Sequence, residues 1–366
     1  MRISERLQEV LFGAILLIGL LLPLPASEVL FDIRDDWQVA RGTKFDWNGL
    51  RRDTMYPGFI DGMERFRPNT AYREFRVNAL GFRGPDIPVL PEEGVIRIAF
   101  IGDSKLLGAD LAPEDTIAEQ TLARLVDRYP ECRFDYALVA GPGWGAWNLF
   151  SIMESDVRPL EADVSLLLAV GPENLLQEYE RLHPDSPDLT RRRGWLETHF
   201  RLAEILARIH NLERERRHAR RLDRQALIPD DGLRTAHQDL YASLVDALGS
   251  DEVVAVAYRG LLRSDQDEAE QLAHSQPLRS ITHGLDGADL AEIYDRMAES
   301  LDDLSAQRGW TYIDPIWSLS SEPTNFSDPA HLTAPAIRDF ARDAATAIGD
   351  RVAQQGHACV QPTNSG

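Results

Sequence analysis

The sequence has little basic charge for its length. Its 366 residues include 39 Lys and Arg against 59 Asp and Glu, a net charge of −20, and only two of the basic residues are lysines. A nucleic-acid partner requires a basic face that neutralises phosphates, so we exclude that class of function. The remaining composition, 43% hydrophobic and 27% charged, is typical of a globular protein with a sizeable core.

Cysteine is also scarce. Cys132 and Cys359 are the two cysteines, and neither has a partner at metal-ligand spacing, so we expect no metal site. In an oxidising compartment they could form a disulfide, and otherwise they would stay free; both alternatives remain open here.

Several familiar motifs are missing. No Walker loop, Gly-x-Gly-x-x-Gly fingerprint or His-Glu-x-x-His occurs, so neither nucleotide nor zinc chemistry is supported, and we expect no cofactor. No Gly-x-Ser-x-Gly elbow occurs either, since Leu106 stands two places after Ser104.

Long apolar runs are absent except at the N-terminus. Residues 10–26 are uncharged and almost wholly apolar, Arg2 and Arg6 precede them, and acidic residues follow. The length suits either a membrane anchor or a signal peptide, and the poor small-residue match before a cleavage at Ala26 favours the anchor. The positive-inside rule then leaves the bulk of the chain outside the cytoplasm. We expect a cytoplasmic tail over 1–9, a single span over 10–27 in the inner membrane, and a periplasmic or otherwise extracytoplasmic domain.

The rest of the chain divides by pattern. Residues 28–90 form an N-terminal extension, in which we expect a hairpin and an extended lead-in. Residues 91–355 form the main domain, with a helical insertion at about 182–235, and 356–366 form a tail. Strands are expected at 96–101, 134–139, 163–170, 253–258 and 310–313. Helices are expected at 116–129, 144–157, 196–222, 236–248, 290–307 and 333–354.

Strands that alternate with helices predict an α/β fold. Right-handed crossovers produce a parallel sheet covered on both faces, and five strands fit a three-layer, flavodoxin-like α/β/α sandwich. In such sheets ligands bind at the carboxyl ends of the strands.

Chemically distinct residues follow four of these strands. Gly102-Asp103-Ser104 ends the first, a glycine-rich turn with Gly143 follows the second, Gly171-x-x-Asn174 follows the third, and Asp328-x-x-His331 follows the fifth. Ser104 would act as nucleophile, His331 as general base, and Asp328 would orient the imidazole. The backbone N–H groups of Ser104 and Gly143 and the Asn174 amide would form an oxyanion hole.

Each assignment has a plainer alternative. Ser104 could be a helix N-cap, His331 a packing residue, and Gly143 or Asn174 only turn residues. Trp144 and Trp147 could form a sugar-stacking wall or simply pack in the core. Lys105 could attract anionic substrate groups, although a position along the surface is the favoured interpretation.

The four blocks resemble those of the SGNH (GDSL) hydrolase family, in order and at plausible distances. Asn78-x-x-Gly81-Phe82-Arg83-Gly84 also resembles the lead-in of membrane-anchored members. The resemblance covers about residues 76–348 and implies a three-layer α/β/α fold with ester or acyl-transfer chemistry. By position it implies a triad of Ser104, Asp328 and His331, with Gly143 and Asn174 as oxyanion donors.

We therefore expect an exported serine esterase or acyltransferase that acts on O-acyl groups, most simply acetyl, of a cell-envelope or secreted polysaccharide. A lipid or thioester acyl hydrolase is the alternative, and a non-catalytic polysaccharide-binding or assembly protein is the second. The expected partners are a carbohydrate or lipid ester, the membrane and, for a transferase, a membrane acyltransferase that delivers acyl groups.

Overall fold

The structure is a computed structural model. It describes residues 23–41, 44–56, 64–168, 171–182, 230–257, 259–279, 285–320, 322–328, 330–357 and 359, with the single positions 202 and 206. The chain forms two compact units, one of residues 1–47 and 191–222 and one of residues 48–190 and 223–366. The second unit contains the sheet and the predicted site residues.

A five-stranded parallel sheet is the centre of the second unit. Its order is β4-β3-β5-β6-β7, from strands β3 (Val95–Gly102), β4 (Arg133–Ala140), β5 (Val164–Leu168), β6 (Val253–Val256) and β7 (Thr311–Ile313). In chain order this is 2-1-3-4-5, the expected flavodoxin-like arrangement. Ile98 pairs with Tyr136 on one side and Val164 on the other. Seven of the eight β3 residues are buried, which explains the uninterrupted apolar run that identified this strand.

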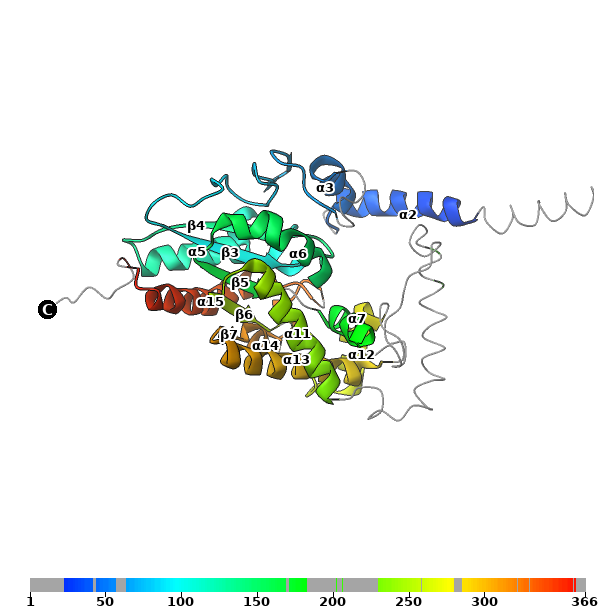
Figure 1. The fold of residues 1–366 in the computed structure, drawn as a ribbon. Coiled ribbons are helices and arrows are strands. Elements are labelled where there is room, and N and C mark those ends of the chain that lie inside the picture. Colours follow the sequence, from blue (N-terminus) through cyan, green and yellow to red (C-terminus); the bar gives the residue numbers. More distant parts are fainter. Residues whose placement is uncertain are drawn as a thin grey trace, which may run out of the picture. The chain divides into compact units, whose positions relative to one another are not determined.

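Helices cover both faces of this sheet (Figure 1). On one face α15 (Ala334–Gln354) packs against α5 (Ile117–Arg128) and against β5, β6 and β7. On the other face Ala99, Ile101 and Leu167 share a hydrophobic cluster with α6 (Ala146–Ile152), α7 (Pro172–Leu182), α11 (Asp230–Leu248) and α13 (Gly287–Arg308). Ala99 and Ile101 alternate with Ile98 and Phe100, so the two faces of β3 serve the two helical layers. The predicted three-layer arrangement agrees with this structure.

The prediction of a helix over residues 144–157 is wrong in detail. The α-helix begins at Ala146, after Gly145, whose backbone N–H donates to Asn148 Oδ1 over 2.9 Å. It ends at Ile152, and a π-helical turn (Met153–Val157) and a 3₁₀ turn (Arg158–Leu160) continue the chain to β5. Several helices were not expected: α3 (Trp47–Thr54), α4 (Ser104–Leu107), α7 (Pro172–Leu182), α12 (Glu268–Arg279), α14 (Pro315–Leu319) and the 3₁₀ turns Pro113–Asp115 and Pro323–Asn325.

The N-terminal extension contains the expected hairpin, β1 (Ala71–Tyr72) with β2 (Phe75–Arg76). It also contains α3 and, in the first unit, α2 (Pro23–Ala40), neither of which the sequence predicted. No helix in the described part of the chain is long and apolar enough to cross a membrane, and residues 10–22 of the expected span lie outside that part. Most of the expected insertion, residues 183–229 except positions 202 and 206, also lies outside it.

The two cysteines form a disulfide. Cys132 precedes β4, Cys359 follows α15, and their Cα atoms are 5.2 Å apart. The bond ties the C-terminal segment to the loop between α5 and β4. Of the two alternatives that the sequence left open, the structure shows the paired one.

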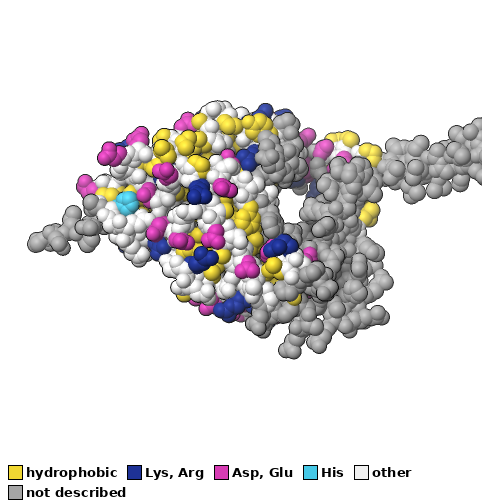
Figure 2. All heavy atoms as spheres, in the orientation of Figure 1, with side chains coloured by type: hydrophobic (Ala, Val, Ile, Leu, Met, Phe, Trp, Pro, Cys, Tyr) yellow, Lys and Arg dark blue, Asp and Glu magenta, His cyan; other side chains and the backbone are white. Residues whose placement is uncertain are grey.

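Surface charge is mixed. Figure 2 shows one face of the molecule, on which Lys and Arg side chains are interspersed with Asp and Glu and do not gather into a basic patch.

Candidate active site

Ser104 lies where β3 ends and α4 begins. Gly102 lets the end of β3 lie close to the end of β5, because a Cβ at this position would lie 2.2 Å from the Leu168 carbonyl oxygen. Asp103 is the N-cap of α4, and its carboxylate accepts the Lys105 backbone N–H over 2.9 Å. The alternative in which Ser104 itself caps the helix is therefore wrong. Ser104 occupies the first helical position, with its side chain available for other contacts.

Ser104 and His331 are hydrogen-bonded although 227 residues separate them: Ser104 Oγ lies 2.9 Å from His331 Nε2. On the other side of the ring, His331 Nδ1 lies 2.7 Å from Asp328 Oδ2. An ionised carboxylate only accepts, so Nδ1 carries the ring proton, Nε2 is left as the acceptor, and the Ser104 hydroxyl donates to it. This arrangement allows the imidazole to take the hydroxyl proton.

The loop before α15 holds His331 and Asp328 in place. Phe326 and Leu332 form an isolated antiparallel bridge, and the Ser327 backbone N–H donates to the His331 carbonyl over 2.9 Å. Asp328 Oδ1 accepts the backbone N–H groups of Ala330 and His331 at 2.8 and 2.9 Å. One carboxylate thus closes its own turn with one oxygen and binds the imidazole with the other.

These contacts decide the charge of Asp328. Partial burial raises the pKa of its carboxyl, but the hydrogen bond and charge of His331 and the two backbone donors outweigh burial and lower the pKa to about 2. Asp328 is therefore a carboxylate at neutral pH, and half of its side chain is exposed to water. His331 is less exposed, at 29% of its side chain.

Two backbone N–H groups are available near the ends of β3 and β4. Gly102 pairs with Ala140, so Ser104 and Gly143 follow directly adjacent strand ends. Within the described residues, neither the Ser104 nor the Gly143 backbone N–H donates to another protein atom. Gly143 has φ +69°, a conformation that other residues adopt only at a cost. Free donors on adjacent strand ends are the parts from which an oxyanion hole is built.

The remaining predicted residues have different environments. Asn174 lies in α7 and Trp147 in α6, but their side chains are outside the described part of the structure. Trp144 is 8% exposed, and its Nε1–H donates to the Glu64 carbonyl over 3.1 Å. Lys105 was expected along the surface and is instead buried: its ammonium forms a 2.7 Å ion pair with Asp103.

Arg83 is a residue whose role sequence reasoning missed. Its buried guanidinium donates to the carbonyls of Leu107, Gly108 and Leu111, the end of α4 and the segment just after it. The guanidinium also lies 4.8 Å from the centre of the Phe75 ring. Arg83 belongs to the motif Asn78-x-x-Gly81-Phe82-Arg83-Gly84, which resembles a family lead-in, but that resemblance assigned no role to any of its residues. Arg83 fixes the far end of the short helix that begins with Ser104.

Asn78 organises the same motif. Its side-chain oxygen accepts the backbone N–H groups of Leu80 and Phe82, each at 3.0 Å, and its amide donates to the Pro85 carbonyl. Gly81 has φ +82°, and at Gly84 a Cβ would lie 2.9 Å from the Tyr136 hydroxyl. The asparagine and the two glycines therefore build the loop that delivers Arg83.

Among the described residues, no cluster of three or more His, Cys, Asp or Glu side chains could hold a metal ion. The chemistry visible in the described part of the chain is that of a hydroxyl, an imidazole, a carboxylate and backbone donors.

Comparison with known proteins adds little. No family model matches the sequence, and no curated protein does. Among solved structures, an acetylxylan esterase from Geobacillus stearothermophilus, Axe2, is 12% identical with a TM-score of 0.41, over 69% of this chain and 94% of that one. LAE5, an alpha/beta hydrolase enzyme from the metagenome of Lake Arreo, is 12% identical with a TM-score of 0.40, over 69% and 95%. A likeness at this level identifies neither the family nor the activity of the chain.

Proposed function

We propose that the protein is a serine esterase or acyltransferase of the SGNH type, which carries an acyl group on Ser104. The observation that supports this most strongly is the hydrogen-bonded series from Ser104 through His331 to Asp328. A serine hydroxyl is a weak nucleophile by itself, and an adjacent base that a third group orients is the usual means of activating it.

In the proposed reaction, the Ser104 oxygen attacks the carbonyl carbon of an ester while His331 Nε2 takes the hydroxyl proton. The backbone N–H groups of Ser104 and Gly143 donate to the carbonyl oxygen as it becomes negative, and Asp328 stabilises the imidazolium. Collapse breaks the bond to the alcohol, which leaves with the proton from His331. The acyl-serine then reacts with water or a sugar hydroxyl by the same steps in reverse, and His331 accepts the proton of the incoming group.

We propose a polysaccharide of the cell envelope, or a secreted one, as the substrate, with acetyl as the simplest acyl group. The apolar segment 10–26 with Arg2 and Arg6 before it supports an exported, membrane-anchored location. The disulfide between Cys132 and Cys359 fits the same location, since such bonds persist in oxidising compartments. A reporter fused after Gly366 tests the topology: activity only of a cytoplasmic reporter contradicts export.

The test of the chemistry is acylation of Ser104. The full chain is incubated with an activated acetyl ester, and the peptide that contains Ser104 is examined by mass spectrometry for an added acetyl group. We expect a labelled Ser104 and ester turnover, both lost in Ser104→Ala. An unlabelled serine, with parent and variant indistinguishable in turnover, would contradict the proposal. Adding an oligosaccharide acceptor then separates the two reactions, because transfer yields an acylated sugar and hydrolysis yields free acetate.

A further inference from the structure

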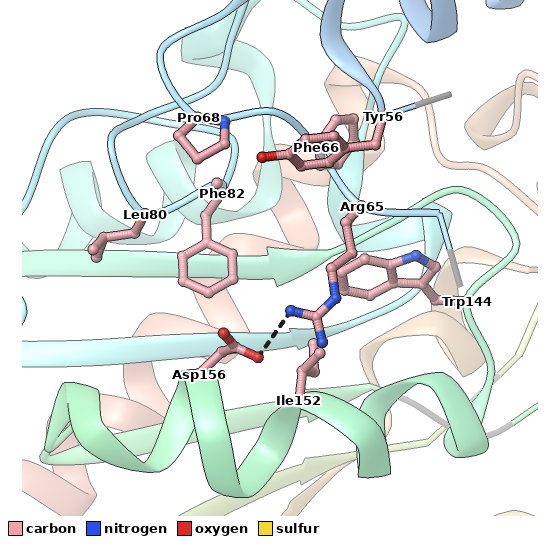
Figure 3. A pocket seen from close by; sticks show the side chains of 10 residues that line it. Tyr56, Arg65, Phe66, Pro68, Leu80, Phe82, Trp144, Ile152 and Asp156 are labelled. Atoms are coloured by element: carbon pink, nitrogen blue, oxygen red, sulfur yellow. Dashed lines mark hydrogen bonds and ion pairs between the residues drawn. The ribbon is translucent and has the colours of Figure 1, made fainter. Parts of the chain in front are cut away.

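A cavity lies in the same compact unit as the site just described. It has a volume of about 280 Å³ and is lined by residues of the N-terminal extension, the turn after β4, and α6 with the turn that follows it. Four aromatic rings and one ion pair dominate its walls (Figure 3): Tyr56, Phe66, Phe82, Trp144, Arg65 and Asp156.

The ion pair gives the cavity a polar side. Arg65 Nη1 lies 3.2 Å from Asp156 Oδ2, and the two side chains are 24% and 37% exposed. Figure 3 shows Arg65 extending from the extension toward Asp156, with the Phe82 ring pointing into the same space. A ligand in this cavity therefore meets aromatic faces and, on another side, a guanidinium and a carboxylate that can donate and accept hydrogen bonds.

This combination favours one class of ligand. An acyl chain would cover the ion pair without replacing its contact with water, and burying charged groups without new hydrogen bonds is costly. A pyranose ring has an apolar C–H face for the aromatic rings and hydroxyl groups for Arg65 and Asp156. The volume is at the lower limit of small-molecule sites, about 300 Å³, which suits a single ring.

Two residues that line the cavity are adjacent in the chain to residues of the candidate active site or its support. Trp144 directly follows Gly143, and its indole fills the space where a Gly141 Cβ would lie, 2.1 Å away. Phe82 directly precedes Arg83, whose guanidinium holds the end of α4. A ligand in the cavity thus contacts the neighbours of a candidate oxyanion donor and of the residue that anchors the nucleophile's helix.

We propose that this cavity is a glycan subsite, which binds a pyranose ring of the substrate next to the ring that bears the acyl group. The inference rests on the proposed function and deepens it, because it assigns the recognition of a carbohydrate to the N-terminal extension. Tyr56 is the exposed ring of the site, at 39%, and so determines affinity without supporting the core.

The test compares four variants of the full chain: Tyr56→Ala, Tyr56→Phe, Asp156→Asn and, as the matched control, Tyr72→Ala on β1, which does not line the cavity. Substrates are ethyl acetate, ethyl hexanoate, acetylated methyl glycosides, and O-acetylated oligosaccharides of glucose, xylose, N-acetylglucosamine and galacturonic acid. Acid release is followed at constant pH. Binding of the unacetylated oligosaccharides is measured in parallel by calorimetry.

We expect at least one oligosaccharide to have a lower KM than its methyl glycoside. Tyr56→Ala should raise that KM about fivefold, as expected for one lost ring contact, and leave kcat and ethyl acetate hydrolysis unchanged. Tyr56→Phe and Tyr72→Ala should match the parent, and Asp156→Asn should weaken oligosaccharide binding.

Either an absence of sugar binding at Tyr56 or a preference for acyl chains would overturn the inference. One is that no oligosaccharide binds better than its methyl glycoside, or that Tyr56→Ala leaves binding unchanged. The other is that Tyr56→Ala impairs ethyl hexanoate hydrolysis in place of oligosaccharide hydrolysis, which would make the cavity an acyl-chain pocket. Failure of the proposed function looks different: the parent hydrolyses no ester and Ser104 stays unlabelled, whereas calorimetry still reports whether the cavity binds a sugar.

Discussion

Replacing Arg83 by methionine tests whether the N-terminal extension holds the nucleophile's helix. Methionine fills a similar length of side chain but donates no hydrogen bond. The carbonyls of Leu107, Gly108 and Leu111 would then remain buried without the donors they have now. Hydrogen bonds from a charged group contribute about 1.5–3 kcal/mol each, so the three together contribute about 4.5–9 kcal/mol.

Part of that contribution offsets the burial of the charge itself. Burial lowers the pKa of Arg83 to about 10 from 12.5, with the nearby groups Tyr136, Asp110 and Glu119 opposing the shift. At about 1.36 kcal/mol per tenfold change, this net shift disfavours the charged form by about 3 kcal/mol. We therefore expect Arg83→Met to lower the free energy of unfolding by about 4 kcal/mol. Arg83→Lys keeps the charge but reaches fewer carbonyls, and should lose about half as much.

Urea unfolding followed by tryptophan fluorescence measures the free energy of unfolding. The rate at which a fluorophosphonate labels Ser104 below the transition reports the nucleophile separately. We expect labelling to slow in Arg83→Met even where the protein is fully folded, with Arg83→Lys intermediate. Arg76→Met, at an exposed arginine of the same extension, is the control and should stay within about 0.5 kcal/mol of the parent. A loss below 1 kcal/mol in Arg83→Met with unchanged labelling would refute the reasoning.

Four further predictions concern the site and the cross-link. Asp328→Asn should lower kcat by about 10³–10⁴-fold, because the amide favours the wrong imidazole tautomer. The pKa of Asp328 falls from 3.8 to about 2 on folding, so its contribution to stability is present above pH 3.8 and lost as the pH falls through about 2. Urea unfolding between pH 4 and 2 should therefore depend less on pH in Asp328→Asn, and an equal dependence would contradict the assignment. In Gly143→Ala the added Cβ meets no atom within 4 Å, so only the φ of +69° should lower the free energy of unfolding, by about 1–2 kcal/mol. Thermal unfolding measures this loss of stability. A fall in kcat/KM larger than the loss of stability explains would report a displaced N–H donor. Reducing the bond between Cys132 and Cys359, which are separated by 227 residues, should cost about 2–4 kcal/mol; an unchanged unfolding midpoint in Cys132→Ser would contradict this.

The sheet could be predicted because its signal is local. Strand β3 is a run of apolar residues buried on both faces, and the other strands recur at intervals that leave room for one crossover each. The right-handedness of crossovers then restricts the orders that these strands can adopt in the sheet. Helix α15 was predicted within one residue for a similar reason, since Pro335 and Thr333 mark its start and an apolar stripe continues to its end.

The extension was harder to predict because its structure depends on distant contacts. Arg83 shows this most clearly: an arginine between phenylalanine and glycine looks like a surface residue, and only the fold brings it to carbonyls 24 to 28 positions later. The prediction of an exposed Lys105 failed for the same reason. A lone lysine is normally exposed, but here the Asp103 carboxylate, which also caps α4, supplies the partner that permits burial.

The environment of Ser104 explains why the short helix that begins with it is supported by residues distant in the sequence. Helix α4 has four residues, too few to be stable by its own hydrogen bonds. Its first turn is closed by the Asp103 carboxylate, and its last carbonyls are satisfied by Arg83. Its C-cap, Gly108, takes a left-handed conformation at φ 55° and donates to the Ser104 carbonyl. Because each end of the helix depends on a different group, the position of the Ser104 hydroxyl relative to His331 depends on the extension as much as on the sheet.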